Sequence, residues 1–236
     1  MPAFDEVQVL AFDVFGTVVD WRGSIAREVD ALGLGVDGGA FADAWRSRYQ
    51  PAMQAVRAGT RPWVRLDVLH RENLDATLVE FGVADRLDES ARVALNLAWH
   101  RLDPWPEARA GLARLKSRFV ITPLSNGNVG LLTRMAKRAA LPWDCVLSAE
   151  VYRAYKPEPG AYLGVADTFD LAPAQVMMVA AHAADLRAAA ACGLRTAYVD
   201  RPLEFGPLRR GDVPRDGDRF DVTSTGFDDL ADRLGC

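Results

Sequence analysis

The order of apolar segments along this chain is the feature that most constrains its fold. A short β-rich run, VQVLAF (7–12), ends at Asp13, and from about Ser24 to Trp99 apolar residues recur at helical intervals instead. Strand-like runs return only after that block and alternate with helical segments. The later strands are expected at 119–125, 145–149, 176–181 and 196–200, and the helices near 107–117, 129–139, 158–168 and 183–192.

Short apolar strands that alternate with helices indicate an α/β fold, here a doubly wound, mainly parallel sheet covered on both faces. The long helical block after the first strand is then a second, all-helical unit. With 236 residues the chain is long enough for a core with a smaller companion. We expect residues 1–20 plus 101–236 to form the core and residues 21–100 to form an inserted helical cap.

Three long segments of the expected cap have helical spacing, at 41–56, 63–81 and 91–102. Between the first helices, residues 33–38 (GLGVDG) match the G-x-G-x-x-G pattern, and G-V-D-G-G resembles a nucleophile elbow. Both patterns require a preceding strand, and here they come after a helix. We therefore interpret these glycines as a loop between helices.

The composition of the chain limits the kinds of partner that it is expected to bind. The formal net charge is −4 and there is no dense Lys/Arg run, which argues against nucleic acid and against a membrane patch. There is no basic-then-apolar leader, and no apolar run reaches the roughly 18 residues of a membrane span. Three cysteines without C-x-x-C spacing predict neither a disulfide framework nor a zinc site. Free thiols fit a cytoplasmic protein.

Ligands of such sheets bind beyond the carboxyl ends of the strands, so the residues after each strand are the candidates for a site. The first strand leads into D-V-F-G-T (13–17), where Gly16 allows a tight turn and Thr17 can cap the next segment. The strand at 119–125 leads into S-N-G-N (125–128). There Ser125 can donate to an anion, and Asn126 can orient a ligand or cap the next helix.

Two further strand ends carry ionisable groups. Lys156 precedes Pro157 and cannot lie inside a helix, so its ammonium is available to pair with a carboxylate. The strand at 176–181 leads through His182 to Asp185 near a helix start, where an acidic residue is favoured by the helix dipole alone. Each signal by itself has an ordinary structural explanation. Their order and shared location at strand ends indicate one site.

This order, D-x-x-G-T, a helical insert, S-N, K-P and a distal Asp, resembles the haloacid dehalogenase superfamily over essentially the whole chain. The resemblance implies a Rossmann-like core with a helical cap and Asp13 as the catalytic nucleophile. Most members of that superfamily look like magnesium-dependent phosphatases. Those enzymes carry a second Asp two residues after the nucleophile, where this chain has Phe15, and an acidic pair at the last site strand. At that strand this chain has Ala180-Ala181 followed by Asp185, so the first carboxylate of the pair is absent. A divalent ion needs several oxygen ligands, and phosphoryl transfer needs cations, so we expect no metal.

The 2-haloacid dehalogenase branch needs neither feature. Arg46 matches the place of its essential arginine, and S-N-G-N, the spacing from Lys156 to Tyr162, and TAYVDRP also fit. The resemblance implies metal-independent and cofactor-free hydrolysis of (S)-2-haloacids or haloacetates to 2-hydroxyacids, through an aspartyl ester and with halide as a product. It also implies a homodimer.

The same resemblance implies roles for the site residues. Asp13 attacks, while Arg46, Asn126 and the ring edge of Phe15 stabilise the departing halide. Ser125 and the backbone after Asp13, including Val14, hold the substrate carboxylate. Lys156 pairs with Asp13 and Asp185. The remaining candidates are Thr17 as a catalytic residue, and Tyr162 and Trp63 in the pocket.

Two questions stay open from the residues. Either Asp185 or His182 can deprotonate the hydrolytic water, since His182 stands where many such dehalogenases read S-S-N and this chain reads A-A-H. The other functions considered are a magnesium-dependent phosphatase or phosphonatase that uses Asp13, and an inactive protein that binds small acids.

Overall fold

The computed structural model describes residues 4–236, and its centre is a six-stranded sheet. The strands are β1 (Val9–Phe12), β4 (Val120–Ser125), β5 (Leu147–Ser148), β6 (Val176–Ala180), β7 (Arg195–Val199) and β8 (Val222–Ser224). Their spatial order is β5-β4-β1-β6-β7-β8, and every neighbouring pair is parallel. The predicted doubly wound parallel sheet is confirmed. Residues 1–3 of the expected core lie outside the described range.

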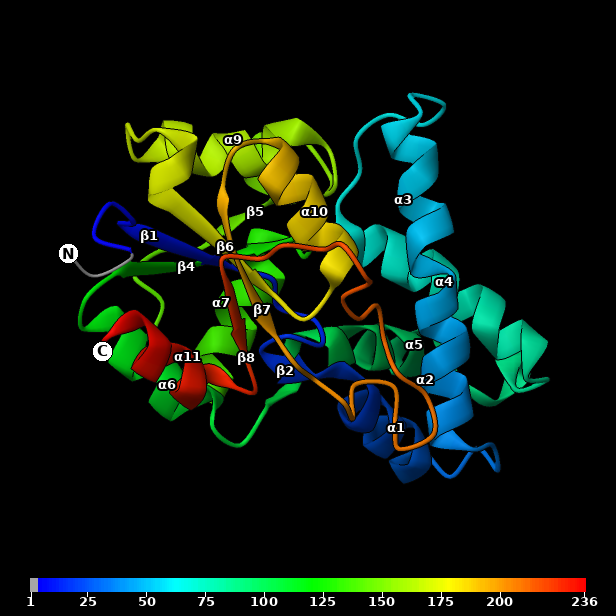
Figure 1. Cartoon of the computed structure of the whole chain (residues 1–236). Helices are drawn as coiled ribbons and strands as arrows, with labels where there is room; N and C mark the ends of the chain where they lie inside the picture. Colours follow the sequence, from blue (N-terminus) through cyan, green and yellow to red (C-terminus); the bar gives the residue numbers. More distant parts are fainter. Residues whose placement is uncertain (1–3) are drawn as a thin grey trace.

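Helices cover both faces of this sheet. They are α6 (Ala108–Lys116), α7 (Val129–Ala139), α8 (Ala149–Tyr152), α9 (Pro159–Thr168), α10 (Ala183–Ala191) and α11 (Phe227–Leu234), with a short 3₁₀ turn η3 (Pro173–Gln175). In Figure 1, α9 and α10 lie above the sheet and α6 and α11 lie below it. Alternate side chains of β1 explain the two layers. Leu10 and Phe12 join one apolar cluster with α6, α7 and α11, while Val9 and Ala11 join another with α9 and α10.

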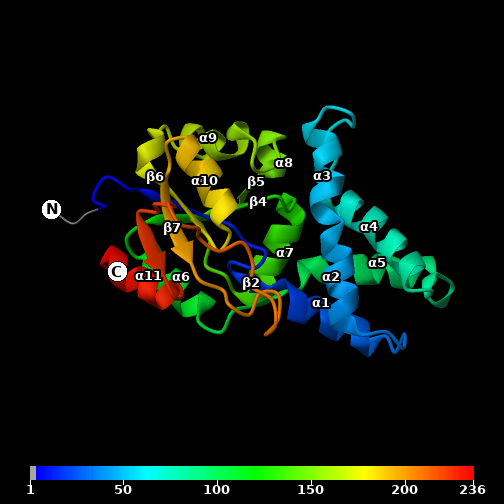
Figure 2. The ribbon, with the colours of Figure 1, turned by 45° about the vertical axis from the view of Figure 1, so that its right-hand side comes forward.

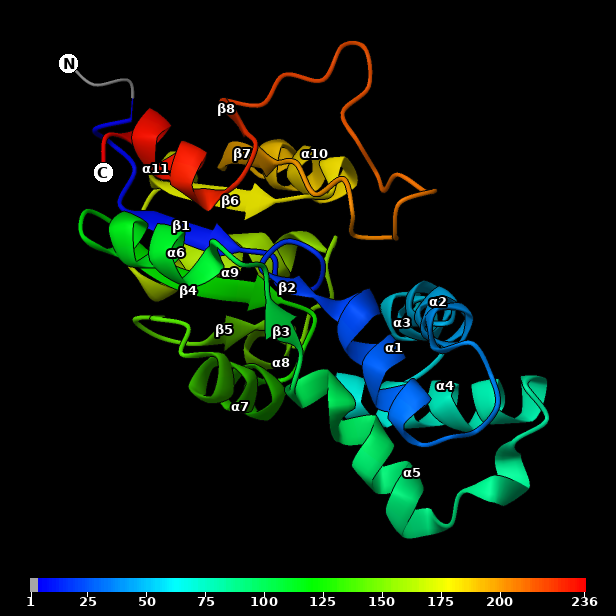
Figure 3. The ribbon, with the colours of Figure 1, turned by 90° about the horizontal axis from the view of Figure 1, so that it is seen from below.

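Every element between residues 21 and 100 is helical, and we call this segment the helical insertion. It contains α1 (Trp21–Ala31), α2 (Gly38–Ser47), α3 (Tyr49–Arg57), α4 (Leu66–Glu80), η1 (Ala84–Arg86), α5 (Glu89–Asn96) and η2 (Leu97–His100). The insertion stands to one side of the sheet in Figure 2, and the arrowheads of β1, β4 and β6 point toward it in Figure 3. It therefore lies over the carboxyl ends of the strands.

A two-stranded antiparallel ribbon flanks the insertion where the chain leaves and rejoins the core. Its strands are β2 (Val19–Asp20) and β3 (Asp103–Pro104), with Val19 opposite Pro104. The first helix after the ribbon, α1, begins on a cap from Asp20, whose carboxylate accepts from the backbone N–H of Gly23 at 2.8 Å. The expectation that Thr17 caps this segment is wrong, because the hydroxyl of Thr17 donates to the carboxylate of Asp13 instead.

The segment expected as one helical stretch at 41–56 is divided. Helix α2 ends at Ser47 and α3 begins at Tyr49. Pro51 explains the break, because it has no N–H for the carbonyl of Ser47 and its ring would clash with that carbonyl in a continuous helix. The glycine-rich segment between α1 and α2 is a loop as expected, with Gly33 and Gly35 at positive φ.

Within residues 4–236, no helix combines the length and the apolar character that crossing a membrane requires.

Candidate active site

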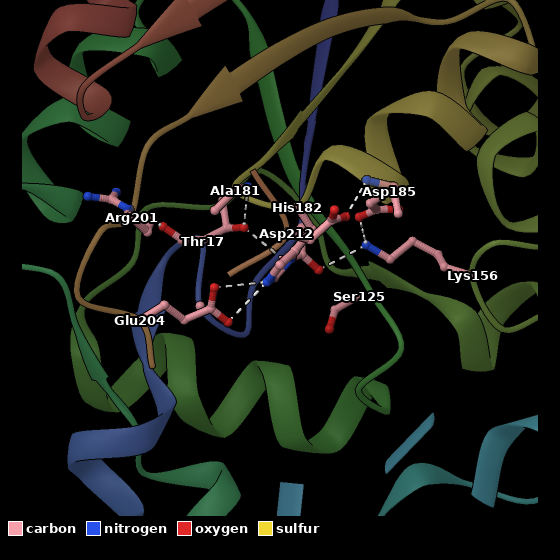
Figure 4. Close-up of polar contacts among 12 residues, drawn as sticks. Thr17, Ser125, Lys156, Ala181, His182, Asp185, Arg201, Glu204 and Asp212 are labelled. Carbon is pink, nitrogen blue, oxygen red and sulfur yellow. Dashed lines mark hydrogen bonds and ion pairs between the residues drawn. The ribbon is translucent and has the colours of Figure 1, made fainter. Parts of the chain in front are cut away.

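The centre of the site is the carboxylate of Asp13, which comes directly after β1 and lies between the ends of β4 and β6. Asp13 is only 7% exposed. Its Oδ1 accepts a hydrogen bond from Nζ of Lys156 at 2.9 Å. Its Oδ2 accepts from the hydroxyl of Thr17 at 2.8 Å and lies 3.1 Å from Nδ1 of His182. Figure 4 shows Thr17, His182 and Lys156, the three residues that make these contacts, close together in the site.

Lys156 lies between two carboxylates. Besides Asp13, its Nζ donates to Oδ2 of Asp185 at 2.5 Å, and the hydroxyl of Tyr162 donates to the other Asp185 oxygen at 2.5 Å. Burial would lower the pKa of Lys156, but the charges of Asp13 and Asp185 raise it above its usual value. Burial would raise the pKa of Asp13, and the charges and hydrogen bonds of Lys156 and His182 lower it instead, well below its usual range. Asp13 is therefore an ionised carboxylate in a buried setting.

The turn after β4 supports this centre. Oδ1 of Asn126 accepts from the backbone N–H of Lys156 at 2.8 Å, which fixes the lysine loop against β4. The oxygen of Ser125 accepts from the N–H of Gly127 at 3.1 Å. Within residues 4–236, the hydroxyl hydrogen of Ser125 and the N–H of Val14 donate to no protein atom. Both groups remain available to an anion.

A cavity of about 560 Å³ lies between this strand edge and the helical insertion. The core contributes Asp13, Phe15, Asn126, Lys156, Pro157, Tyr162, His182, Ala184, Asp185, Phe205, Arg209 and Asp212 to its walls, and the insertion contributes Trp21, Asp43, Arg46, Ser47, Tyr49, Gln50 and Arg57. The volume leaves ample room for a small organic acid.

Arg46 on α2 is the cation of the opposite wall. Its guanidinium carbon lies 3.8 Å from the ring centroid of Tyr49 and 5.5 and 5.8 Å from those of Trp21 and Phe15. Its Nη1 is buried and has no hydrogen-bond partner among the described residues. Aromatic faces stabilise the charge without using the N–H donors. Because an unpaired buried donor is costly, this group is suited to receive an anion.

Most of the residues expected in the site come together. Asp13, Thr17, Lys156, His182, Asp185 and Tyr162 form one hydrogen-bonded group, and Phe15, Arg46 and Asn126 line the same cavity. Ser125 and Val14 were expected to hold the substrate, but both are buried and are not among the residues that line the cavity.

Two further expectations differ from the structure. Trp63 does not reach the cavity, because its ring packs on Tyr155 with centroids 4.5 Å apart. Thr17 is not a helix cap. Its oxygen instead accepts from the N–H of Ala181 at 2.9 Å while its hydroxyl donates to Asp13, so it connects the end of β6 to Asp13.

Sequence reasoning missed Glu204, on the loop after β7. It is 2% exposed, and its two carboxylate oxygens lie 3.0 and 3.1 Å from Nε2 of His182. The indole N–H of Trp21 donates to the same carboxylate at 3.0 Å. The rule that ligands gather at strand ends could have flagged Glu204, which lies five residues after the end of β7.

The model of the haloacid dehalogenase-like hydrolase family matches residues 7–193, most of the chain. The chain belongs to this family. As a haloacid dehalogenase-like hydrolase it is 30% identical over 213 residues to (S)-2-haloacid dehalogenase 1 of Pseudomonas sp. (strain CBS-3), which covers 87% of this chain and 92% of that protein. It is 29% identical to (S)-2-haloacid dehalogenase 4A of Burkholderia cepacia, and the match covers 87% of this chain and 90% of that protein.

Solved structures agree with the sequence relatives. This hydrolase is 46% identical to a defluorinating L-2-haloacid dehalogenase, with a TM-score of 0.94 over 98% of this chain and 96% of the other.

Proposed function

We propose that this hydrolase is a (S)-2-haloacid dehalogenase that converts (S)-2-haloacids or haloacetates to 2-hydroxyacids through an aspartyl ester on Asp13. The observation that carries the proposal is that two groups line the same cavity: Asp13, a carboxylate whose pKa is held low, and Arg46, whose buried Nη1 has no hydrogen-bond partner among the described residues. The similar proteins of both comparisons bear the same activity in their names.

In the first step, an oxygen of Asp13 attacks the α-carbon and the carbon–halogen bond breaks with its electron pair on the halide. Attack from the side opposite the halogen inverts the carbon. Lys156 keeps Asp13 ionised at neutral pH, and the largely dry setting leaves the carboxylate poorly solvated and reactive. The halide needs no proton to leave.

Arg46 receives the developing halide charge, together with the amide of Asn126 and the positive ring edge of Phe15. The ring of Tyr49 pre-organises the guanidinium, and its Nη1 has no hydrogen bond to the described residues that would have to break before it reaches the halide. Stabilisation of a developing charge by fixed donors is strongest where water is excluded.

The substrate carboxylate binds the free hydroxyl hydrogen of Ser125 and the free N–H of Val14. With the carboxylate held there and the halogen at Arg46, the α-carbon presents one face to Asp13. This arrangement favours one enantiomer. Tyr162 positions Asp185, and Lys156 joins both carboxylates.

In the second step, water attacks the carbonyl carbon of the ester, releases the 2-hydroxyacid and restores Asp13. The helical insertion, residues 21–100, acts as the cap domain that covers the cavity.

We further propose that the protein is a cytoplasmic homodimer. The three cysteines of the chain are free, which fits a reducing compartment. Light scattering of the purified protein measures the oligomeric state.

The test is halide release from chloroacetate and from each enantiomer of 2-chloropropionate, with EDTA present. We expect release from chloroacetate and the (S)-enantiomer, unaffected by EDTA and lost in Asp13→Asn. Release that requires Mg²⁺, or that survives in Asp13→Asn, contradicts the proposal.

A further inference from the structure

The two oxygens of Asp13 have different surroundings. Oδ2 faces two donors, the hydroxyl of Thr17 and Nδ1 of His182, whereas among residues 4–236 Oδ1 receives a hydrogen bond from Nζ of Lys156 alone. The oxygen with fewer donors keeps a lone pair for attack. Oδ1 is therefore the oxygen that joins the substrate carbon, and Oδ2 becomes the carbonyl oxygen of the ester.

His182 lies between two carboxylates. Nδ1 lies 3.1 Å from Oδ2 of Asp13, and Nε2 lies 3.0 and 3.1 Å from the two oxygens of Glu204. A neutral imidazole has one N–H and would turn a lone pair toward one of these carboxylates, whereas an imidazolium donates to both. The geometry alone therefore favours the charged ring.

The wider charges around His182 agree with this geometry. Asp13 after β1 and Glu204 after β7 face the ring directly, and Asp185 on α10 and Asp212 before β8 share the cavity. The cations of the same cavity are Lys156, Arg46, Arg57 and Arg209. Burial would lower the pKa of His182, but the charge of Glu204, with Asp13, raises it to about 10.

The site is built to hold Glu204 in this position. A Cβ at residue 16 would lie 2.2 Å from Oε1 of Glu204, so only glycine leaves room for the carboxylate beside the nucleophile loop. Gly16 also has φ +88°, which glycine adopts without strain. Trp21 donates to Glu204 from the helical insertion, so the carboxylate is fixed from both sides.

We propose that Glu204 is a positioning residue that keeps His182 as an imidazolium, and that His182 with Thr17 forms the oxyanion hole of ester hydrolysis. This proposal rests on the dehalogenase function above. It assigns His182 as a donor to Oδ2 and not as the base, because an imidazolium has no lone pair to take a proton from water.

Atoms and charges balance in the hydrolysis step. Water adds to the carbonyl carbon of the Asp13 ester, one of its protons passes to Asp185, and the negative charge moves to Oδ2 between Thr17 and His182. The bond from the carbonyl carbon to Oδ1 breaks, and Oδ1 takes the proton held by Asp185 and leaves as the hydroxyl of the product, which restores Asp185. The second proton goes to solvent, so each turnover yields one 2-hydroxyacid, one halide and one proton.

Nitrogen-15 NMR of histidine-labelled enzyme tests the charge directly. The chain has three histidines, and His182→Asn identifies the signal of His182. We expect both ring nitrogens of His182 to be protonated at pH 8 in the wild type and one of them to lose its proton at pH 8 in Glu204→Gln. A neutral His182 in the wild type at pH 8 overturns the proposal. The wild-type spectrum decides this without any substrate and without a variant at position 204.

Single-turnover kinetics with (S)-2-chloropropionate tests the role. Glu204→Gln is expected to release halide in a burst but to hydrolyse the ester about 10²-fold more slowly, the usual loss for an oxyanion donor. Its hydrolysis step should decline as pH rises through neutrality, while the wild type should decline only near pH 10. Glu204→Asp, which keeps the charge, should restore part of the rate. Glu28→Gln, which removes a carboxylate paired with Arg101 at the surface, should leave the rate at the wild-type value.

Equal ester hydrolysis in Glu204→Gln and wild type, with an unchanged pH profile, overturns the role. Slow ester hydrolysis in Glu204→Gln with the same pH profile as the wild type also overturns the role. If the wild type releases halide from no haloacid, the dehalogenase function and the oxyanion role both fail, while the NMR result still decides the charge of His182.

Discussion

Lys156 donates to Asp13 across 2.9 Å, and both side chains are nearly fully buried, at 6% and 7% exposed. The ammonium is the one donor to Oδ1 of Asp13 among the described residues, and it also binds Asp185. A buried charge without its partner is costly, so this pair stabilises the folded state and also keeps the carboxylate of Asp13 ionised.

Lys156→Met should therefore reduce both activity and stability. Two carboxylates would lose their shared cation, which we expect to raise the pKa of Asp13 and to cost about 3–5 kcal/mol of folding free energy. Halide release and urea unfolding measure the two effects. Lys116→Met, which removes an exposed lysine paired with Asp144, should change neither by much. Wild-type activity in Lys156→Met would contradict this role.

Arg46→Gln should slow the first step, by about 10²–10³-fold, because the halide would lose its cation. The loss should be smaller for bromoacetate than for chloroacetate, since bromide leaves more readily. Halide bursts in rapid-quench experiments measure that step. Arg48→Gln, two residues along and paired with the exposed Glu80, is the matched control. An equal loss for both halogens would show that Arg46 acts in binding alone.

Thr17→Val should reduce activity about tenfold or more and destabilise the fold by about 1–3 kcal/mol. The substitution keeps the shape, but Asp13 loses a donor and the buried N–H of Ala181 loses its acceptor. Thr17→Ser, which keeps the hydroxyl, should retain most of the activity and most of the stability. Steady-state rates and unfolding curves for the pair separate the hydroxyl from the methyl group.

The charge of His182 should make stability depend on pH in a defined direction. The pKa is raised by folding from 6.5 to about 10, so the stabilisation is fully present below pH 6.5 and is lost as pH rises toward 10. The difference in unfolding free energy between wild type and His182→Asn should shrink over that interval. A difference that grows with pH would contradict the assignment.

Much of this fold could be predicted because local and global signals agree. The strands that end at Phe12, Ser125, Ala180 and Val199 are largely apolar runs of ordinary length, and helices separate them. Since parallel strands place their carboxyl ends together, the residues after these strands meet without any knowledge of contacts. Asp13, Ser125, Asn126 and Asp185 were found in this way.

The rest depends on packing between distant segments. Glu204 reaches His182 and Trp21 from a loop without regular structure, and no periodicity signals that contact. Trp63 was expected in the pocket wall but packs on Tyr155, and this contact between distant segments also leaves no signal in the sequence. The break between α2 and α3 was readable from Pro51, because the rule is local.

The most direct test of the central claim is a single turnover in water enriched in oxygen-18, with enzyme in excess over (S)-2-chloropropionate. An aspartyl ester predicts that the label enters the carboxylate of Asp13, seen by mass spectrometry of the peptide that contains it, while the hydroxyacid stays unlabelled. Label in the hydroxyacid and none in Asp13 would mean that water attacks the substrate carbon directly, and would contradict the account.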